Sequence, residues 1–278
     1  MKTVIKLFKQ AGLLWYHSGA DTMAAAVSYY AMFALVPLIL FSLYVVSILY
    51  GEEYVVEVML AWGSGMGTGV VLLLKEAVAN LSNNPPVLFA PVVGATFLLL
   101  AVLIFMNTFT KGLHNIWGSS HIGFLATFQK SVRALVYVFI LQIFIIALIA
   151  AEFAFALIFE GAPFATYLIN ILYVFAFTVL VVLLFSVLPL SDIPSLESRV
   201  YGGLIAALCF VMGKTFVSFH IAVTPIPDLF GAAGVALVLL LWVYVSTSFV
   251  YFGAAFAKVH DEMKNRQIDI RIENNIDN

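Results

Sequence analysis

Six long apolar runs constrain this 278-residue chain more than any other feature of its sequence. A transmembrane helix needs about 20 predominantly apolar residues. The windows that meet this length are residues 23–49, 87–110, 134–159, 164–190, 200–223 and 231–257. Charged residues make up only 10% of the chain, against about 25% in a soluble domain, so there is too little polar surface to cover a soluble fold. An integral membrane protein is expected.

The apolar runs indicate helices rather than the strands of a barrel. Barrel strands alternate apolar and polar residues over about ten positions, whereas "LLLAVLIFM" at 98–106 is continuous. A helix satisfies its own backbone hydrogen bonds in lipid. The fold class is therefore predicted to be all-α, with one six-helix transmembrane domain over residues 1–260.

The basic residues are distributed unevenly along the chain. With the N-terminus placed inside, eleven of the 13 Lys and Arg residues fall on the cytoplasmic side, Lys75 falls outside and Lys214 lies within a span. Cytoplasmic loops carry such an excess of Lys and Arg. Both termini are therefore predicted to be cytoplasmic.

Three segments outside the spans have characters of their own. Residues 1–20 alternate lysines with large apolar residues, which is typical of an amphipathic helix on the cytoplasmic leaflet. Residues 51–86 form the first outer loop, and the glycine-rich "GSGMGTG" within it is expected to join two short interfacial helices. Residues 261–278 are a polar cytoplasmic tail, expected to be loosely ordered.

Lys214 is the unusual residue of the fifth span, because an ammonium within a bilayer costs roughly 3 to 10 kcal/mol. At 100° per residue it shares a stripe with Gly203, Ala207 and Ser218, and small residues allow close helix approach. This face is predicted to point into the bundle. Glu152 lies at a similar depth in the third span. The polar cluster proposed as a substrate or ion path consists of Lys214, Glu152, Asn170, His220 and Ser218.

Three interpretations of Lys214 stay open. A pair with Glu152 could serve only to fix helix registry, since a buried pair seldom adds net stability. The pair could instead line an outward-opening polar cavity that meets an ionic or amphipathic solute or passes a proton. Alternatively the two residues never meet, and Lys214 snorkels outward.

A second polar set lies at the cytoplasmic side of the first two spans. Its members are Asp21, Ser28, Asn107, Lys111, His114 and Asn115. Asp21 is expected to cap the first spanning helix. Pro37 and Pro91 are expected to kink or hinge their helices.

No residue pattern recommends catalysis. The five histidines are scattered over different segments, and no spacing typical of a metal site or of a serine hydrolase is present. We expect no enzymatic activity, no metal and no cofactor. A last-helix stripe of Trp242, Ser246, Gly253 and Ala257 is interpreted as a packing seam.

Four stretches resemble one known family. They are "DTMAAAVSYYAMFALVPLILF" (21–41), "GLHNIWG" (112–118), "SVLPLSDIPSLESRVYGGLIAALCFVMGKTF" (186–216) and "FGAAGVALVLLLWVYVSTSFVYFGAAFAKV" (230–259). They resemble, with intact spacing, the YihY/BrkB-like bacterial inner-membrane proteins. The family's usual Gly-Ala-Glu reads Gly253-Ala254-Ala255 here, so a carboxylate role at that position does not carry over.

The resemblance implies a multi-pass protein of the bacterial cytoplasmic (inner) membrane, of a family described as virulence factors. It was formerly mislabelled ribonuclease BN, a label that the residues oppose because they offer neither a metal cluster nor a basic nucleic-acid surface. Membrane lipids are the expected partners, and nucleic acid is not.

Three functions follow as hypotheses. In the first, the chain translocates or handles an amphipathic, lipid-like envelope solute. In the second, it exchanges a monovalent cation for a proton through Glu152, with Asp21 as a second candidate. In the third, it is a non-transporting scaffold. A scaffold would dock periplasmic or envelope proteins through residues 51–86.

Overall fold

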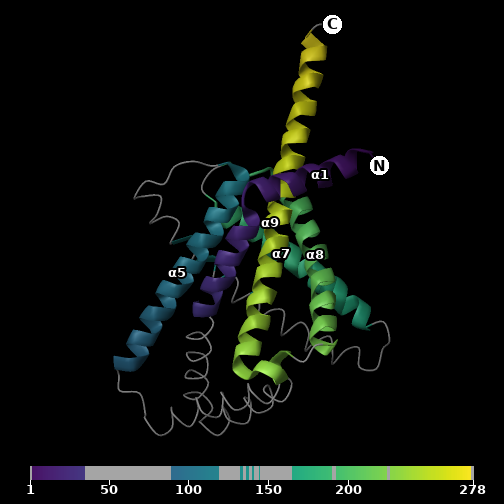
Figure 1. Ribbon diagram of the computed structural model, residues 1–278. Coiled ribbons are helices and arrows are strands. Elements are labelled where there is room, and N and C mark those ends of the chain that lie inside the picture. The colour runs from purple at the N-terminus through teal and green to yellow at the C-terminus, as the bar shows by residue number, and fades with distance from the viewer. Residues whose placement is uncertain are drawn as a thin grey trace. The chain divides into compact units, whose positions relative to one another are not determined.

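The computed structural model describes residues 2–34, 89–118, 132–133, 136–137, 140, 144, 165–189, 192–223 and 226–276. Its named helices are α1 (Lys2–His17), α5 (Phe89–Trp117), α7 (Ala165–Val187), α8 (Leu196–Val223) and α9 (Ile226–Ile276). Residues 20–34 are also helical, and no strand occurs among the described residues. The part of the chain described is therefore all-helical, as predicted (Figure 1).

Three helices in the described ranges are long and apolar enough to cross a membrane: Leu99–Trp117, Leu196–Gly213 and Ala236–Arg266. Ile171–Val187 is a shorter apolar helix. The three long helices coincide with the second, fifth and sixth predicted spans, in that order. The shorter helix coincides with the fourth predicted span. Most of the third span, and residues 35–49 of the first, lie outside the described residues.

The chain divides into two compact units. The second unit consists of Ala25–Phe105 and Thr215–Val245. Within it, Tyr29 packs edge-on against Tyr30 and Phe33, with ring centroids 5.5 and 4.9 Å apart. The first unit consists of Met1–Ala24, Met106–Lys214 and Ser246–Asn278.

A two-residue turn ends α1 and starts the next helix. Ser18 N–H donates to Leu14 O at 2.9 Å, and Gly19 adopts the left-handed conformation, with φ of 65°. Glycine enters this region without steric cost, which is why it commonly terminates helices. Gly19 O then accepts the N–H of Met23 at 3.0 Å, opening the helix over 20–34.

That geometry corrects the predicted cap. Gly19, rather than Asp21, stands before the first helical residue, and Asp21 lies within the first turn. Its carboxylate still lies near the positive end of the helix dipole. Pro91 is the third residue of α5, where its missing N–H forfeits no helical hydrogen bond, and Pro37 lies outside the described residues.

Two helices extend beyond the apolar runs that predicted their spans. α5 continues past residue 110 to Trp117, where Gly118 N–H donates to His114 O at 2.8 Å and Gly118 takes a φ of 77°. The tail expected to be loosely ordered is helical as far as Ile276. The hydropathy of a sequence indicates where a helix leaves the lipid. The helix itself continues until its backbone hydrogen bonds end.

α9 is the helix on which the first unit is assembled. Figure 1 shows α1 lying across it, and the Phe8 ring contacts the rings of Phe252 and Phe256 at centroid distances of 6.3 and 5.2 Å. α8 packs on α7 through stacked rings of Phe177 and Phe210, 4.3 Å apart. The core is rich in alanine and aromatic residues, which suits close helix packing.

Candidate functional site

The predicted intramembrane cluster is only partly located. Lys214, Ser218 and His220 are residues of α8, and Asn170 is a residue of α7, but none of these side chains is described. Glu152 lies outside the described residues, as does the whole 51–86 loop. The pairing of Lys214 with Glu152 therefore stays a prediction.

The small-residue stripe of the fifth span does face other helices. Gly203 and Ala207 are buried, and a Cβ added at Gly203 would lie 2.9 Å from Val182 Cγ2 and 3.2 Å from Thr178 O. α7 thus packs closely against α8 at Gly203. The inward orientation predicted for Gly203 and Ala207 is confirmed.

The second predicted polar set does not share one environment. Ser28 is buried and donates to Ala25 O of its own helix at 2.8 Å, so its hydroxyl is already satisfied. Lys111 and Asn115 are exposed, while Asn107 and His114 are half-buried. Thr22 Oγ1 donates to the carboxylate of Asp21 at 3.5 Å.

The family-like stretches 112–118 and 186–216 each contact the stretch 230–259, near the C-terminal end of α5, and we name this region the motif junction. Trp117 is its centre: the indole N–H donates to Ala254 O at 3.0 Å, and the ring packs edge-on against Phe185 at 5.6 Å. Tyr251 lies one turn away, and its hydroxyl donates to Phe109 O at 3.0 Å. Both side chains are fully buried, so these bonds satisfy polar groups that water cannot reach.

Lys258 completes the motif junction at the end of α5. Its ammonium donates to Trp117 O at 3.1 Å and lies 3.6 Å from a carboxylate oxygen of Glu262. The last carbonyls of a helix have no partner within it, and a cation there also favours the negative end of the helix dipole. Lys258 therefore fastens the C-terminal end of α5 to α9.

Glycines bring α8 and α9 into backbone contact beside this junction. A Cβ added at Gly202 would collide with Gly253 O and would lie 2.8 Å from Ala257 Cβ. A Cβ added at Gly253 would collide with Gly202 O and would lie 2.8 Å from Ala206 Cβ. The predicted packing seam of α9 is confirmed at Gly253 and Ala257, and its partner is α8.

A polar cluster joins the start of α8 to α9. Asp261 Oδ1 accepts the Ser195 N–H at 3.0 Å, the Ser195 hydroxyl at 2.5 Å and the Ser198 hydroxyl at 3.1 Å. Lys264 pairs with Glu197 close by. Ser195 holds the N-cap position of α8, because its carbonyl accepts the N–H of Arg199 at 3.0 Å.

These charged groups lie beyond the apolar runs 200–223 and 231–257, and their pKa values reflect the cluster. Burial alone would raise the pKa of Asp261, but the hydrogen bonds from Ser195 and Ser198 outweigh burial and hold the pKa below its usual range. The hydrogen bond and charge of Lys264 lower the pKa of Glu197. Both carboxylates thus serve as anions.

The cluster also contains a serine, a histidine and an aspartate, but not in catalytic order. Ser198 Oγ lies 2.9 Å from His260 Nδ1, and the carboxylate of Asp261 receives hydrogen bonds from the serines. In a catalytic triad the carboxylate instead holds the other ring nitrogen of the histidine. Ser198 is fully buried. The arrangement is that of a helix cap shared between two helices.

Arg133 reaches the loop between α7 and α8. Its guanidinium donates to Pro189 O at 2.7 Å, and Arg199 donates to Ser186 Oγ. Within the described ranges, no group of three or more His, Cys, Asp or Glu residues is placed to hold a metal ion. The side chains of this region fasten helices to one another.

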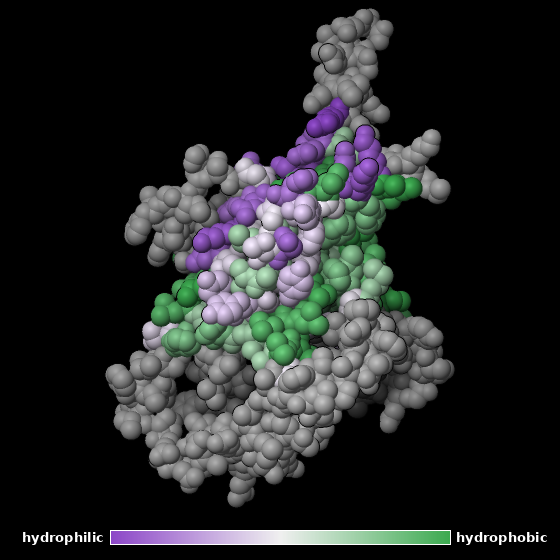
Figure 2. Space-filling view, in the orientation of Figure 1, coloured by the Kyte–Doolittle hydropathy of each residue, from purple (hydrophilic) through white to green (hydrophobic). Residues whose placement is uncertain are grey.

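A groove of about 340 Å³ lies between α1 and α9, outside the motif junction. It is lined by Lys6, Gln10, Leu14, Val259, Glu262, Met263 and Arg266. Hydrophilic side chains gather where α1 meets the polar part of α9, as Figure 2 shows. The sequence did not indicate this groove, because its two walls are more than 240 positions apart.

The described helices and their contacts define an α-helical membrane protein whose motif residues tie its helices together at one end. The chain belongs to the family described as Virulence factor BrkB, whose model matches residues 16–275. The predicted family resemblance is confirmed.

Two relatives illustrate how far the similarity extends. The chain is 24% identical over 254 residues to a UPF0761 membrane protein of Mannheimia succiniciproducens, covering 87% of this chain and 84% of that protein. It is 23% identical over 284 residues to a UPF0761 membrane protein of Coxiella burnetii, covering 92% and 96%. No solved structure matches the chain.

Proposed function

We propose that the chain is a multi-pass protein of the bacterial inner membrane that translocates or handles an amphipathic, lipid-like solute of the envelope, without enzymatic activity. In this proposal six helices cross the membrane and both termini are cytoplasmic. The uneven distribution of Lys and Arg supports the orientation, and Lys258 at the end of α5 lies on the side that this orientation makes cytoplasmic.

The arrangement of α1 carries the proposal. Phe8 packs α1 onto α9, yet α1 leaves Val4, Ile5, Leu13 and Tyr16 about half exposed or more, at 53%, 62%, 49% and 67%. A basic helix that exposes large apolar residues beside its lysines is suited to lie in the plane of the bilayer surface. The protein thereby presents apolar and basic groups together at the height of lipid headgroups.

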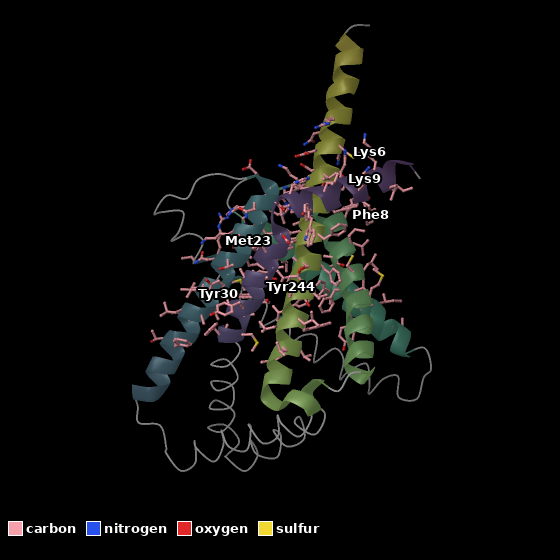
Figure 3. The ribbon with its side chains drawn as sticks, viewed as in Figure 1. Lys6, Phe8, Lys9, Met23, Tyr30 and Tyr244 are labelled. Carbon is pink, nitrogen blue, oxygen red and sulfur yellow. The ribbon has the colours of Figure 1, made fainter. Side chains whose placement is uncertain are left out.

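This feature favours a lipid-like solute over a monovalent ion. A hydrated cation gains nothing from exposed apolar side chains, whereas an amphipathic molecule has an apolar part that they can contact and an anionic part that lysines attract. Figure 3 shows Phe8 and Lys6 on opposite sides of α1. Because Phe8 packs on α9, the apolar contacts that remain for such a solute are those of the exposed residues of α1.

Reconstitution tests the proposal. Purified protein in liposomes is expected to move a fluorescent phospholipid between leaflets, measured as the loss of protection from a membrane-impermeant quencher. Lys214→Leu is expected to abolish the movement, whereas Gly12→Ala, which adds a methyl group that meets no heavy atom within 4 Å and removes no charge, is expected to retain it. Equal rates in protein-free vesicles and in proteoliposomes would reject the proposal.

A further inference from the structure

The groove between α1 and α9 is built from one face of each helix. Lys6, Gln10 and Leu14 recur every fourth residue along α1, and the lining residues of α9 recur at intervals of three and four. Such spacing places side chains above one another on a single helix face. The groove is therefore a property of two ordered helices rather than of a loop.

The charges in the groove leave a positive excess. Lys6 and Arg266 are exposed, and no carboxylate of the described residues pairs with either. The acidic member of the lining, Glu262, lies 3.6 Å from the ammonium of Lys258, which offsets its charge. Gln10 adds an uncharged hydrogen-bond donor. A guanidinium, an ammonium and an amide suit the oxygens of a phosphate group.

The rest of the lining is apolar. Leu14, Val259 and Met263 face the same groove, and its volume of about 340 Å³ lies at the lower end of small-molecule sites. A free phosphate ion would lose hydration against these side chains and gain nothing from them. A phosphate that carries a glycerol backbone and acyl chains would gain apolar contact.

We propose that this groove binds the phosphate headgroup of an anionic phospholipid, with Lys6 and Arg266 on the phosphate and Leu14, Val259 and Met263 beside the glycerol end. Lys6 lies on the side of α1 away from Phe8, toward the polar part of α9 (Figure 3). The inference deepens the proposed function, on which the placement of α1 at the bilayer surface rests, by naming a headgroup class. It concerns binding, whereas the proposed function concerns movement.

Lipid retention measures the binding directly. The full chain is purified in neutral detergent with equal amounts of phosphatidylglycerol and phosphatidylcholine, and native mass spectrometry counts the lipids that stay bound. Wild-type protein is expected to retain phosphatidylglycerol preferentially. Lys6→Gln and Arg266→Gln should each reduce that preference about tenfold or more, the factor expected for the loss of one hydrogen bond between charged groups.

Lys9→Gln is the matched control, because it removes the same charge from the same helix but from outside the groove. Its preference is expected to match the wild type. An equal loss in Lys6→Gln and Lys9→Gln would overturn the site, since it would report general surface charge. All three positions are exposed, and an unchanged melting temperature verifies that each variant is folded.

A competition arm separates a lipid from free phosphate. Short-chain phosphatidylglycerol is expected to displace the retained lipid, whereas inorganic phosphate at the same concentration is not. Displacement by inorganic phosphate alone would overturn the lipid assignment. If lipid retention follows the expectation but liposomes show no lipid movement, lipid binding by the groove is supported and the proposed function is rejected. If liposomes show lipid movement but retention does not depend on Lys6 and Arg266, only lipid binding by the groove is rejected.

Discussion

Replacing Gly202 by alanine tests the backbone contact between α8 and α9. The added methyl group would collide with Gly253 O and lie 2.8 Å from Ala257 Cβ, whereas carbon atoms pack best at about 3.5–4.0 Å. The two helices must therefore move apart by about 1 Å. Overpacking of this kind costs about 1–3 kcal/mol, and alanine returns up to about 1 kcal/mol through its higher helix propensity.

The expected result is a net loss of up to about 2 kcal/mol. For a chain of this size that lowers the melting temperature by roughly 2–4 °C per kcal/mol. The measurement is thermal unfolding of the purified protein in detergent. Gly253→Ala should behave alike, and the double variant should lose less than the sum of the two, because both substitutions force open the same contact.

Gly12→Ala supplies the matched control. It is the same substitution in a helix, but an added Cβ there meets no heavy atom within 4 Å. Gly12→Ala is therefore expected to raise stability slightly, by about 0.5–1 kcal/mol. The reasoning is refuted if Gly202→Ala raises the melting temperature as Gly12→Ala does.

Further predictions concern the ties between helices. Trp117→Phe removes the donor to the buried Ala254 carbonyl and should cost about 1–3 kcal/mol in thermal unfolding; an unchanged melting temperature would contradict the assigned bond. Lys258→Met removes the cation at the C-terminal end of α5. Exchange of the backbone amide hydrogens in the last turn of α5 is expected to become faster, by a factor that corresponds to a loss of about 1 kcal/mol or less in local stability. Asp261 has a lowered pKa, so the stability it contributes is present at neutral pH and is lost as the pH falls below about 3.9. In the Asp261→Asn variant, stability should fall less steeply at acid pH than in the wild type. An identical fall in both proteins would exclude the role proposed for the hydrogen bonds from Ser195.

The sequence predicted the helices and their inward small-residue faces because both depend on local composition. Runs of apolar residues report lipid contact, and small residues at helical spacing report close approach. Gly203 and Ala207 are buried as this reasoning requires. The family motifs were likewise visible as strings of residues.

The contacts of the motif junction could not be predicted from local sequence, because they join positions that are far apart in the chain. Trp117 and Ala254 are 137 residues apart, and nothing local distinguishes an indole N–H that meets a carbonyl from one that lies at the membrane surface. Ser195 was a detectable exception: a serine after Pro194 and before a helix is a cap signal. Its partner Asp261 was not, since the polar tail looked suited only to water.

The turn at Ser18 and Gly19 has a mechanical consequence. Two residues separate α1 from the helix that begins at residue 20, and hydrogen bonds from both hold the turn closed. If α1 lies on the bilayer surface as proposed, a connection this short fixes the depth at which the following helix enters the bilayer. In a thinner membrane that helix would then have to tilt, so its tilt would follow bilayer thickness.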